Sequence, residues 1–223
     1  MYGLITYIRN VLFDKGILKT QHHNIPILSV GNLKAGGTGK TPFVEYLLRT
    51  FSSSFNIAVV SRGYGRKTKG FFVVNPEGSA ETFGDEPLQM ARKFPEVMFV
   101  VCEDRNFAIK EIEKRNQESI ERNQESVERN QDSAERNKEI NLILLDDAFQ
   151  HRYTARDIDI LLTEYNRPFF SDKVIPFGLL REYRRGFKRA DYIVVTKCPP
   201  LNFEDKKRFV EKLKPRFGQR IFF

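Results

Sequence analysis

The stretch that decides the fold covers residues 25–42 and reads IPILSVGNLKAGGTGKTP. An apolar run over residues 25–30 predicts a buried strand, and a glycine-rich loop follows it directly. Residues 42–51 then have the pattern of a helix. A strand, a glycine-rich loop and a helix in this order are typical of a P-loop, so we predict a nucleoside triphosphate site here.

The loop supplies each part of such a site. We assign nucleotide binding to eight consecutive residues, which are Lys34, Ala35, Gly36, Gly37, Thr38, Gly39, Lys40 and Thr41. Glycines let successive backbone N–H groups turn toward phosphate oxygens, and the start of the helix adds a favourable dipole. We expect Lys40 to reach the β- and γ-phosphates and the Thr41 hydroxyl to bind Mg²⁺. Lys34 occupies the position where the usual pattern has its first glycine.

An acidic pair provides the expected partner of the loop. The apolar run over residues 142–145 predicts a strand, and Asp146 and Asp147 follow it. P-loop enzymes hold Mg²⁺ with a carboxylate at the end of a neighbouring strand. We expect Asp146 to address the metal, and Asp147 to address its water ligands or the γ-phosphate. His151 follows in the same turn, either as a structural hydrogen-bonding group or as a catalyst.

Several further apolar runs extend the pattern. They predict strands over residues 57–61, 71–74, 97–101, 158–163, 192–196 and 220–223. Most are continuous rather than alternating, which is typical of strands covered on both faces. Helical segments over residues 86–93, after 105 and over 203–215 lie between them. We therefore predict an α/β, P-loop NTPase-like fold with a mostly parallel sheet flanked by helices.

Two segments stand apart from this core, which we place at residues 21–223. Residues 1–20 predict an amphipathic helix with Leu4, Ile5 and Ile8 on one stripe, either packed on the core or lying in a membrane interface. Residues 114–137 repeat every seven residues, with one apolar residue in each complete repeat. They predict a helical low-complexity insertion, either an oligomerisation arm or a neutral surface expansion.

Composition narrows the class of protein. Apolar residues make up 40% of the chain, which indicates a globular protein, and the net charge of +8 favours anionic partners. No apolar run reaches the ~18 residues of a membrane-spanning helix. The four residues Thr196-Lys197-Cys198-Pro199 lack the Asp of the guanine-reading [NT]-K-x-D motif, which favours ATP over GTP.

Six blocks of sequence, in order, carry a family resemblance. They are SVGNL with GGTGKTP (29–42), SRGYGR (61–66), GDEP (84–87), DDAFQH (146–151), LRE (180–182) and VTKCP (195–199). Together they resemble the tetraacyldisaccharide 4′-kinases of lipid A biosynthesis. This resemblance implies transfer of the ATP γ-phosphate, with Mg²⁺, to the 4′-hydroxyl of a tetraacylated glucosamine disaccharide 1-phosphate.

The resemblance also implies partners and a location. The partners are the lipid A precursor disaccharide and the anionic surface of the inner membrane of a Gram-negative bacterium, at its cytoplasmic face, with no nucleic acid. A peripheral attachment there favours the membrane interpretation of the N-terminal helix and suits the positive charge. Oligomeric state stays open.

Residue roles carry over motif by motif. The resemblance makes Asp85 the general base, with Lys40, Asp147 and Arg181 as the other catalytic groups. Read from the residues alone, Asp85 would cap the helix that follows it. Six residues are assigned to the substrate by their motifs, namely Asn32, Arg62, Tyr64, Glu86, Arg181 and Glu182.

The chain departs from the family pattern in two places. Tyr183 stands where the family has Pro after the Arg-Glu pair, and none of His22, His23 and His151 matches the histidine that assists the base. We therefore expect a kinase that lacks its C-terminal lobe, binding ATP with Mg²⁺ but catalysing poorly or not at all. The alternatives are a P-loop ATPase or kinase of a soluble small molecule, and a non-catalytic nucleotide-binding interaction protein.

Overall fold

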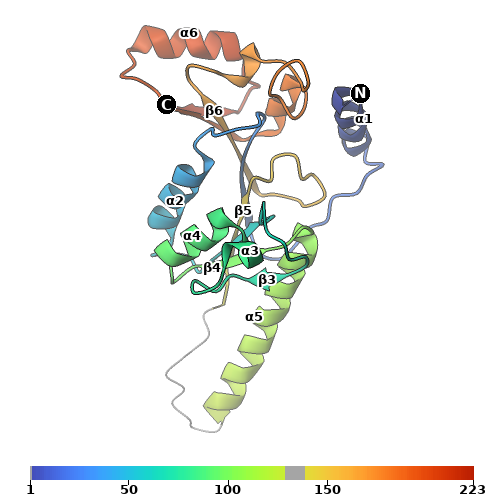
Figure 1. Cartoon of the computed structure of the whole chain (residues 1–223), viewed down its shortest axis with the longest axis vertical. Coiled ribbons are helices and arrows are strands. Elements are labelled where there is room, and N and C mark those ends of the chain that lie inside the picture. The colour runs from blue at the N-terminus through green and yellow to red at the C-terminus, as the bar shows by residue number, and fades with distance from the viewer. Residues whose placement is uncertain (1, 129–138) are drawn as a thin grey trace. The chain divides into compact units, whose positions relative to one another are not determined.

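The computed structural model describes residues 2–128 and 139–223. These residues form two compact units (Figure 1). Unit 1 combines the chain up to Gln21 with Leu28–Val44 and Asp146–Phe223, and unit 2 combines His22–Ile27 with Glu45–Leu145. The whole glycine-rich loop and both aspartates after residue 145 therefore belong to unit 1.

Unit 1 is built on parallel strands. In spatial order they are β1 (Ile27–Asn32), β6 (Ile158–Glu164), β7 (Tyr192–Thr196) and β8 (Arg220–Phe222). Every adjacent pair is parallel, with Val30 opposite Ile160 and Leu162 opposite Val194. All residues of β1 are buried. The continuous apolar pattern predicted this coverage on both faces.

An apolar core lies beside β7. Helix α6 (Phe203–Leu213) places Phe209 and Leu213 in that core, together with Ile193 and Val195 of β7. A capping box between Asn202 and Asp205 satisfies the first N–H groups of α6. Two short 3₁₀ helices, η1 (Phe169–Ser171) and η2 (Arg184–Arg189), add Phe169 and Phe187 to the same core. The sequence did not predict these two helices.

Unit 2 has its own set of strands. They run in the order β3 (Phe72–Val73), β4 (Met98–Val101), β2 (Ile57–Ser61) and β5 (Leu142–Asp146), the last ending in unit 1. β2 pairs in parallel with β4 and β5, whereas β3 is antiparallel to β4. The remaining elements are α3 (Ala80–Phe83), α4 (Asp85–Lys93), which packs on β4, and α5 (Arg105–Glu128), which contacts β2. The predicted α/β fold with a mostly parallel sheet is confirmed.

Helix α5 contains the first part of the heptad segment. It stays helical through Glu128, well into the repeats that begin at residue 114 (Figure 1). This confirms the helical prediction up to that residue, and residues 129–137 of the predicted arm lie outside the described residues. None of the described helices combines the length and the apolar character needed to cross a membrane.

Helix α1 (Tyr2–Asp14) turns its apolar stripe away from the protein. The side chains of Leu4, Ile5 and Ile8 are 58%, 63% and 49% exposed, whereas Thr6 is buried. The predicted amphipathic helix is present, but packing of these three residues into the core is excluded. An apolar helix face exposed to water is a candidate surface for lipid or another apolar partner.

Candidate functional site

The glycine-rich loop leads directly from β1 into α2 (Lys40–Phe51). Gly36 has a φ of 111° and Gly39 a φ of 81°, values that favour glycine. The amide of Phe43 donates to the Gly39 carbonyl at 3.2 Å, so helical hydrogen bonding starts as soon as the loop ends. The helix therefore directs its positive end at the space beside the loop, where an anion is stabilised.

Lys40, Asp147 and Arg181 meet beside this loop. Lys40 Nζ lies 3.5 Å from one Asp147 carboxylate oxygen, and Arg181 Nη1 donates to both oxygens of that carboxylate at 2.9 and 2.8 Å. All three side chains are partly exposed, at 16%, 35% and 28%. Two cations around one carboxylate leave a net positive charge that faces solvent. Such a cluster suits a polyphosphate.

Thr41 and Asp146 are the chain neighbours of the Lys40–Asp147 contact. Thr41 is the second residue of α2, and Asp146 is the last residue of β5. Within residues 2–128 and 139–223 no three His, Cys, Asp or Glu side chains gather into a metal cage. A hydroxyl and a carboxylate are the hard oxygen ligands that Mg²⁺ takes from proteins, with water and phosphate completing its shell. The donor set therefore fits Mg²⁺ bound together with a nucleotide.

The turn that carries the aspartates packs tightly on β1. A Cβ placed on Gly31 would lie 2.6 Å from the Cβ of Phe149, so no side chain fits there. The Ala148 amide donates to the Val30 carbonyl at 3.3 Å, and Gln150 Nε2 donates to the Asn32 carbonyl at 2.8 Å. These contacts fix the Asp146–Asp147 turn against the strand that feeds the phosphate-binding loop.

Asn32 holds the loop from inside, which differs from the expected substrate contact. Its side chain is fully buried, and its amide donates to the Thr38 hydroxyl at 2.6 Å and to the Gly36 carbonyl at 3.4 Å. A group enclosed in this way is not presented to a sugar. Its position points to shaping of the loop.

Lys34 and Ala35 are also engaged elsewhere. The Lys34 ammonium pairs with Asp172 at 2.9 Å and donates to the Arg167 carbonyl at 3.1 Å, while the Ala35 amide donates to the Leu179 carbonyl at 2.7 Å. Partial burial opposes ionisation of Asp172, but the hydrogen bond from Lys34 contributes to lowering its pKa. In this structure the Lys34 ammonium and the Ala35 amide, which we expected to contact phosphate, are therefore occupied by protein partners.

Glu182 is buried and bonded to three other side chains, whereas we expected it to contact the substrate. It is inaccessible to solvent. Its carboxylate accepts from Asn10 of α1 at 2.7 Å, from Gln150 at 3.4 Å, and from two nitrogens of Arg189 at 3.0 and 2.8 Å. The expected substrate role conflicts with this burial. Glu182 instead links α1, the aspartate turn and η2 next to Arg181.

The other expected site residues belong to unit 2. Asp85 is the first residue of α4, and the residue that caps this helix is Gly84, with a φ of 88°. The interpretation of Asp85 as the cap was therefore displaced by one residue. A Cβ on Gly84 would lie 3.0 Å from the Tyr64 carbonyl, so the start of α4 lies against the SRGYGR loop. The four expected site residues of this region are all exposed, namely Arg62, Tyr64, Asp85 and Glu86. Tyr64 is 94% exposed.

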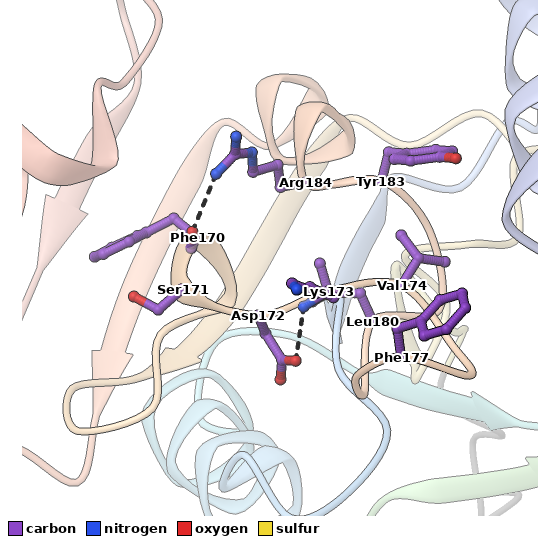
Figure 2. Close-up of a pocket in the computed structure, with 9 residues that line it drawn as sticks. All are labelled: Phe170, Ser171, Asp172, Lys173, Val174, Phe177, Leu180, Tyr183 and Arg184. Carbon is purple, nitrogen blue, oxygen red and sulfur yellow. Dashed lines mark hydrogen bonds between the residues drawn. The ribbon is translucent and has the colours of Figure 1, made fainter.

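Unit 1 also contains an apolar pocket of about 560 Å³. Figure 2 shows its lining, which comes from one segment and comprises Phe170, Ser171, Asp172, Lys173, Val174, Phe177, Leu180, Tyr183 and Arg184. Helix α1 borders this segment, because a Cβ on Gly3 would lie 3.1 Å from Val174 and the rings of Tyr7 and Tyr183 are 6.0 Å apart. The pocket therefore lies close to the helix with the exposed apolar stripe.

Comparison with known proteins assigns the family. The family model of the tetraacyldisaccharide-1-P 4′-kinases matches residues 1–220. The chain belongs to this family of kinases. A tetraacyldisaccharide 4′-kinase from Flavobacterium johnsoniae is 43% identical over the whole chain, and one from Flavobacterium psychrophilum is 47% identical over 89% of it.

Structural comparison agrees with this 4′-kinase assignment. A crystal structure of LpxK from Aquifex aeolicus, described as a complex with ATP, has a TM-score of 0.72 and 36% identity over 91% of this chain. The chain spans 58% of that kinase and 60% and 52% of the two Flavobacterium relatives. The likeness therefore covers the described fold but only part of the length of these kinases.

Sequence reasoning missed three groups of this candidate site. Gln150 and Arg189 are fixed to Glu182, and the Thr196-Lys197 pair contacts the phosphate-binding loop. The signal for the last pair was present, since Thr196 ends β7 and Lys197 follows it, at the edge where parallel strands present their ligands. It was used only to compare ATP with GTP.

Proposed function

We propose that this chain binds ATP with Mg²⁺ through unit 1 and transfers the γ-phosphate to the 4′-hydroxyl of a tetraacylated glucosamine disaccharide 1-phosphate. The observation that carries the proposal is the cluster of Lys40, Asp147 and Arg181 beside the glycine-rich loop. The family and the ATP complex of its Aquifex aeolicus member support it.

The phosphate side of the reaction rests on two cations. In the proposed complex the loop amides from Gly36 onward hold the phosphates, and Lys40 bridges the β- and γ-phosphates. Arg181, placed by its bonds to Asp147, neutralises the charge on the phosphoryl group that is transferred. Thr41 and Asp146 would hold Mg²⁺, which neutralises charge on the β- and γ-phosphate oxygens when bound.

The acceptor side is assigned from the family motifs. Asp85 takes the proton from the 4′-hydroxyl as that oxygen bonds to the γ-phosphorus. The bond from the γ-phosphorus to the β–γ bridging oxygen breaks, and ADP leaves with that oxygen. Arg62, Tyr64 and Glu86 are exposed on the same unit and serve as sugar-binding groups in this proposal.

The lipid character of the substrate is supported by two apolar features of unit 1. The first is the pocket that contains Phe170, Val174 and Phe177 and suits an acyl chain. The second is the exposed stripe of α1, which we propose lies in an anionic membrane surface with the basic chain drawn to it.

Calorimetry with Lys40→Met tests the nucleotide site. We expect wild type to bind MgATP and Lys40→Met to bind at least about tenfold more weakly, because a charge-assisted contact is lost. Lys207→Met, which removes an exposed lysine of α6, is the matched control and should bind like wild type. Equal affinity of wild type and Lys40→Met for MgATP would contradict the proposal. Transfer of labelled γ-phosphate to the disaccharide then tests the substrate.

A further inference from the structure

The last residue of β7 and the residue after it hold two carbonyls of the phosphate-binding loop. The Thr196 hydroxyl donates to the Thr38 carbonyl at 2.9 Å, and Lys197 Nζ donates to the Gly37 carbonyl at 2.7 Å. Lys197 has a φ of 55°, in the left-handed region that non-glycine residues rarely adopt. Two consecutive loop carbonyls are thus held by two consecutive residues from a segment some 160 residues away in the chain.

Thr196 and Lys197 also contact β6. Lys197 forms a short ion pair with Glu164, the last residue of β6, and Thr196 also contacts the Thr163 carbonyl at 3.3 Å. The hydrogen bond from Lys197 is the main reason that the pKa of Glu164 is lowered. Glu164 pairs with Arg167 as well, at 3.2 Å. The position of Lys197 is therefore set by the sheet.

Holding a carbonyl also orients the amide in the same peptide unit. In a trans peptide the C=O and N–H bonds point in opposite directions. The peptide that joins Thr38 to Gly39 has its carbonyl fixed by Thr196, so the Gly39 N–H is directed to the opposite side of the loop. A phosphate nest requires such N–H groups to point inward together.

We propose that Thr196 and Lys197 form a clip that fixes the loop in its triphosphate-binding conformation, with Lys197 as a positioning residue. The clip rests on the proposed function, namely that this loop binds a nucleoside triphosphate. The Lys197 charge is balanced by Glu164 and its ammonium is directed at a loop carbonyl. Lys197 therefore acts on the shape of the loop and not on the nucleobase.

This mechanism makes a distinctive prediction for ligands that lack a base. A loop that samples its competent shape only one tenth of the time binds about tenfold more weakly, whatever is attached to the phosphates. We therefore expect Lys197→Met to weaken the binding of MgATP and of magnesium tripolyphosphate by the same factor, roughly tenfold. Lys197→Arg, which keeps a cationic donor, should restore both affinities to within about threefold of wild type.

Titration calorimetry of wild type, Lys197→Met, Lys197→Arg and the control Lys207→Met with both ligands tests the clip. Equal loss for both ligands in Lys197→Met, with rescue by Arg, supports it. Unchanged affinity, or a loss confined to MgATP that indicates a base contact, overturns it. If wild type binds neither ligand, the proposed function fails together with the clip, whereas a failure of the clip alone leaves wild-type binding intact.

A second variant guards against misfolding. The Lys197 side chain is 53% exposed, so its replacement should leave the thermal midpoint near that of wild type. Thr196→Val keeps the shape of the side chain and removes only the hydroxyl that holds Thr38. We expect the same parallel loss of both ligands, about fivefold, from this variant. A folded Thr196→Val protein with wild-type affinities would overturn the clip even if Lys197→Met failed to fold.

Discussion

Arg181 donates from a single guanidinium nitrogen to both carboxylate oxygens of Asp147, at 2.9 and 2.8 Å. The same carboxylate lies 3.5 Å from Lys40, so Asp147 connects the lysine of the glycine-rich loop to an arginine that is 141 residues further along the chain. Removal of Arg181 would leave Asp147 with less compensation next to a bound triphosphate.

We therefore predict that Arg181→Met weakens MgATP binding by about tenfold, because the loss of one charge-assisted contact and the added repulsion from Asp147 act together. Calorimetry measures the effect. Arg208→Met, at an exposed position of α6, is the matched control and should retain wild-type affinity. An unchanged Kd in Arg181→Met would show that Arg181 plays no part in holding the nucleotide.

Glu182 should matter for stability. Replacing it with Gln leaves the Arg189 guanidinium, which is only 19% exposed, without its counter-charge. We expect the free energy of unfolding to fall by about 3 kcal/mol in Glu182→Gln. Urea titration followed by circular dichroism measures it. Glu204→Gln, at an exposed position, is the control and should stay within about 0.5 kcal/mol of wild type. A similarly small change in Glu182→Gln would refute a stabilising role of the Glu182–Arg189 pair.

Asp159 gives the fold a pH dependence. Burial raises the pKa of Asp159 to about 6, although Arg156 lies 3.1 Å away. Its pKa in the unfolded chain is about 3.9, so its contribution to stability is complete below that pH and is lost as the pH rises through about 6.

The unfolding free energy of wild type minus that of Asp159→Asn should therefore decrease by about 2–3 kcal/mol from pH 4 to pH 6.5. Urea unfolding of both proteins at several pH values in this range measures the difference. A difference that stayed constant, or that increased with pH, would mean that Asp159 is not a carboxyl of raised pKa.

The exposed stripe of α1 should govern membrane binding. Burying one large aliphatic side chain contributes about 1.5–3 kcal/mol, so Ile5→Gln should weaken partition into anionic phosphatidylglycerol vesicles by roughly tenfold or more. Co-sedimentation with vesicles measures this. Ile120→Gln, the same change at an exposed site on α5, is the control. Comparable partition of Ile5→Gln and wild type would exclude this face of α1 as the contact.

The sequence predicted the fold well because local patterns determine it. The apolar runs gave β2 and β7 with their observed bounds, and the glycine-rich loop placed the start of α2 within two residues. The aspartate pair was also found from its position after a strand. Each of these signals lies within a few consecutive residues.

The roles of site residues were harder to predict where the burial of a side chain depends on segments far away in the sequence. Asn32 and Glu182 were assigned to substrate from their motifs, but both are fully buried. The partner of Glu182 on α1 is 172 residues away in the chain, and Lys197 reaches the loop across 160 residues. No local pattern in a single sequence reports such contacts, so a motif by itself does not tell whether a polar residue binds a ligand or supports the fold.

The contact of Gly31 with Phe149 has a consequence for how this site can vary. Where a side chain lies between two helices or strands, a substitution or a rotamer change can adjust the distance between them. Here a Cβ on Gly31 would lie 2.6 Å from the Cβ of Phe149, so the two backbones approach with no room for a side chain between them. The spacing between the strand that leads into the glycine-rich loop and the Asp146–Asp147 turn is therefore set by the backbone, so variation that preserves it must occur elsewhere in the site.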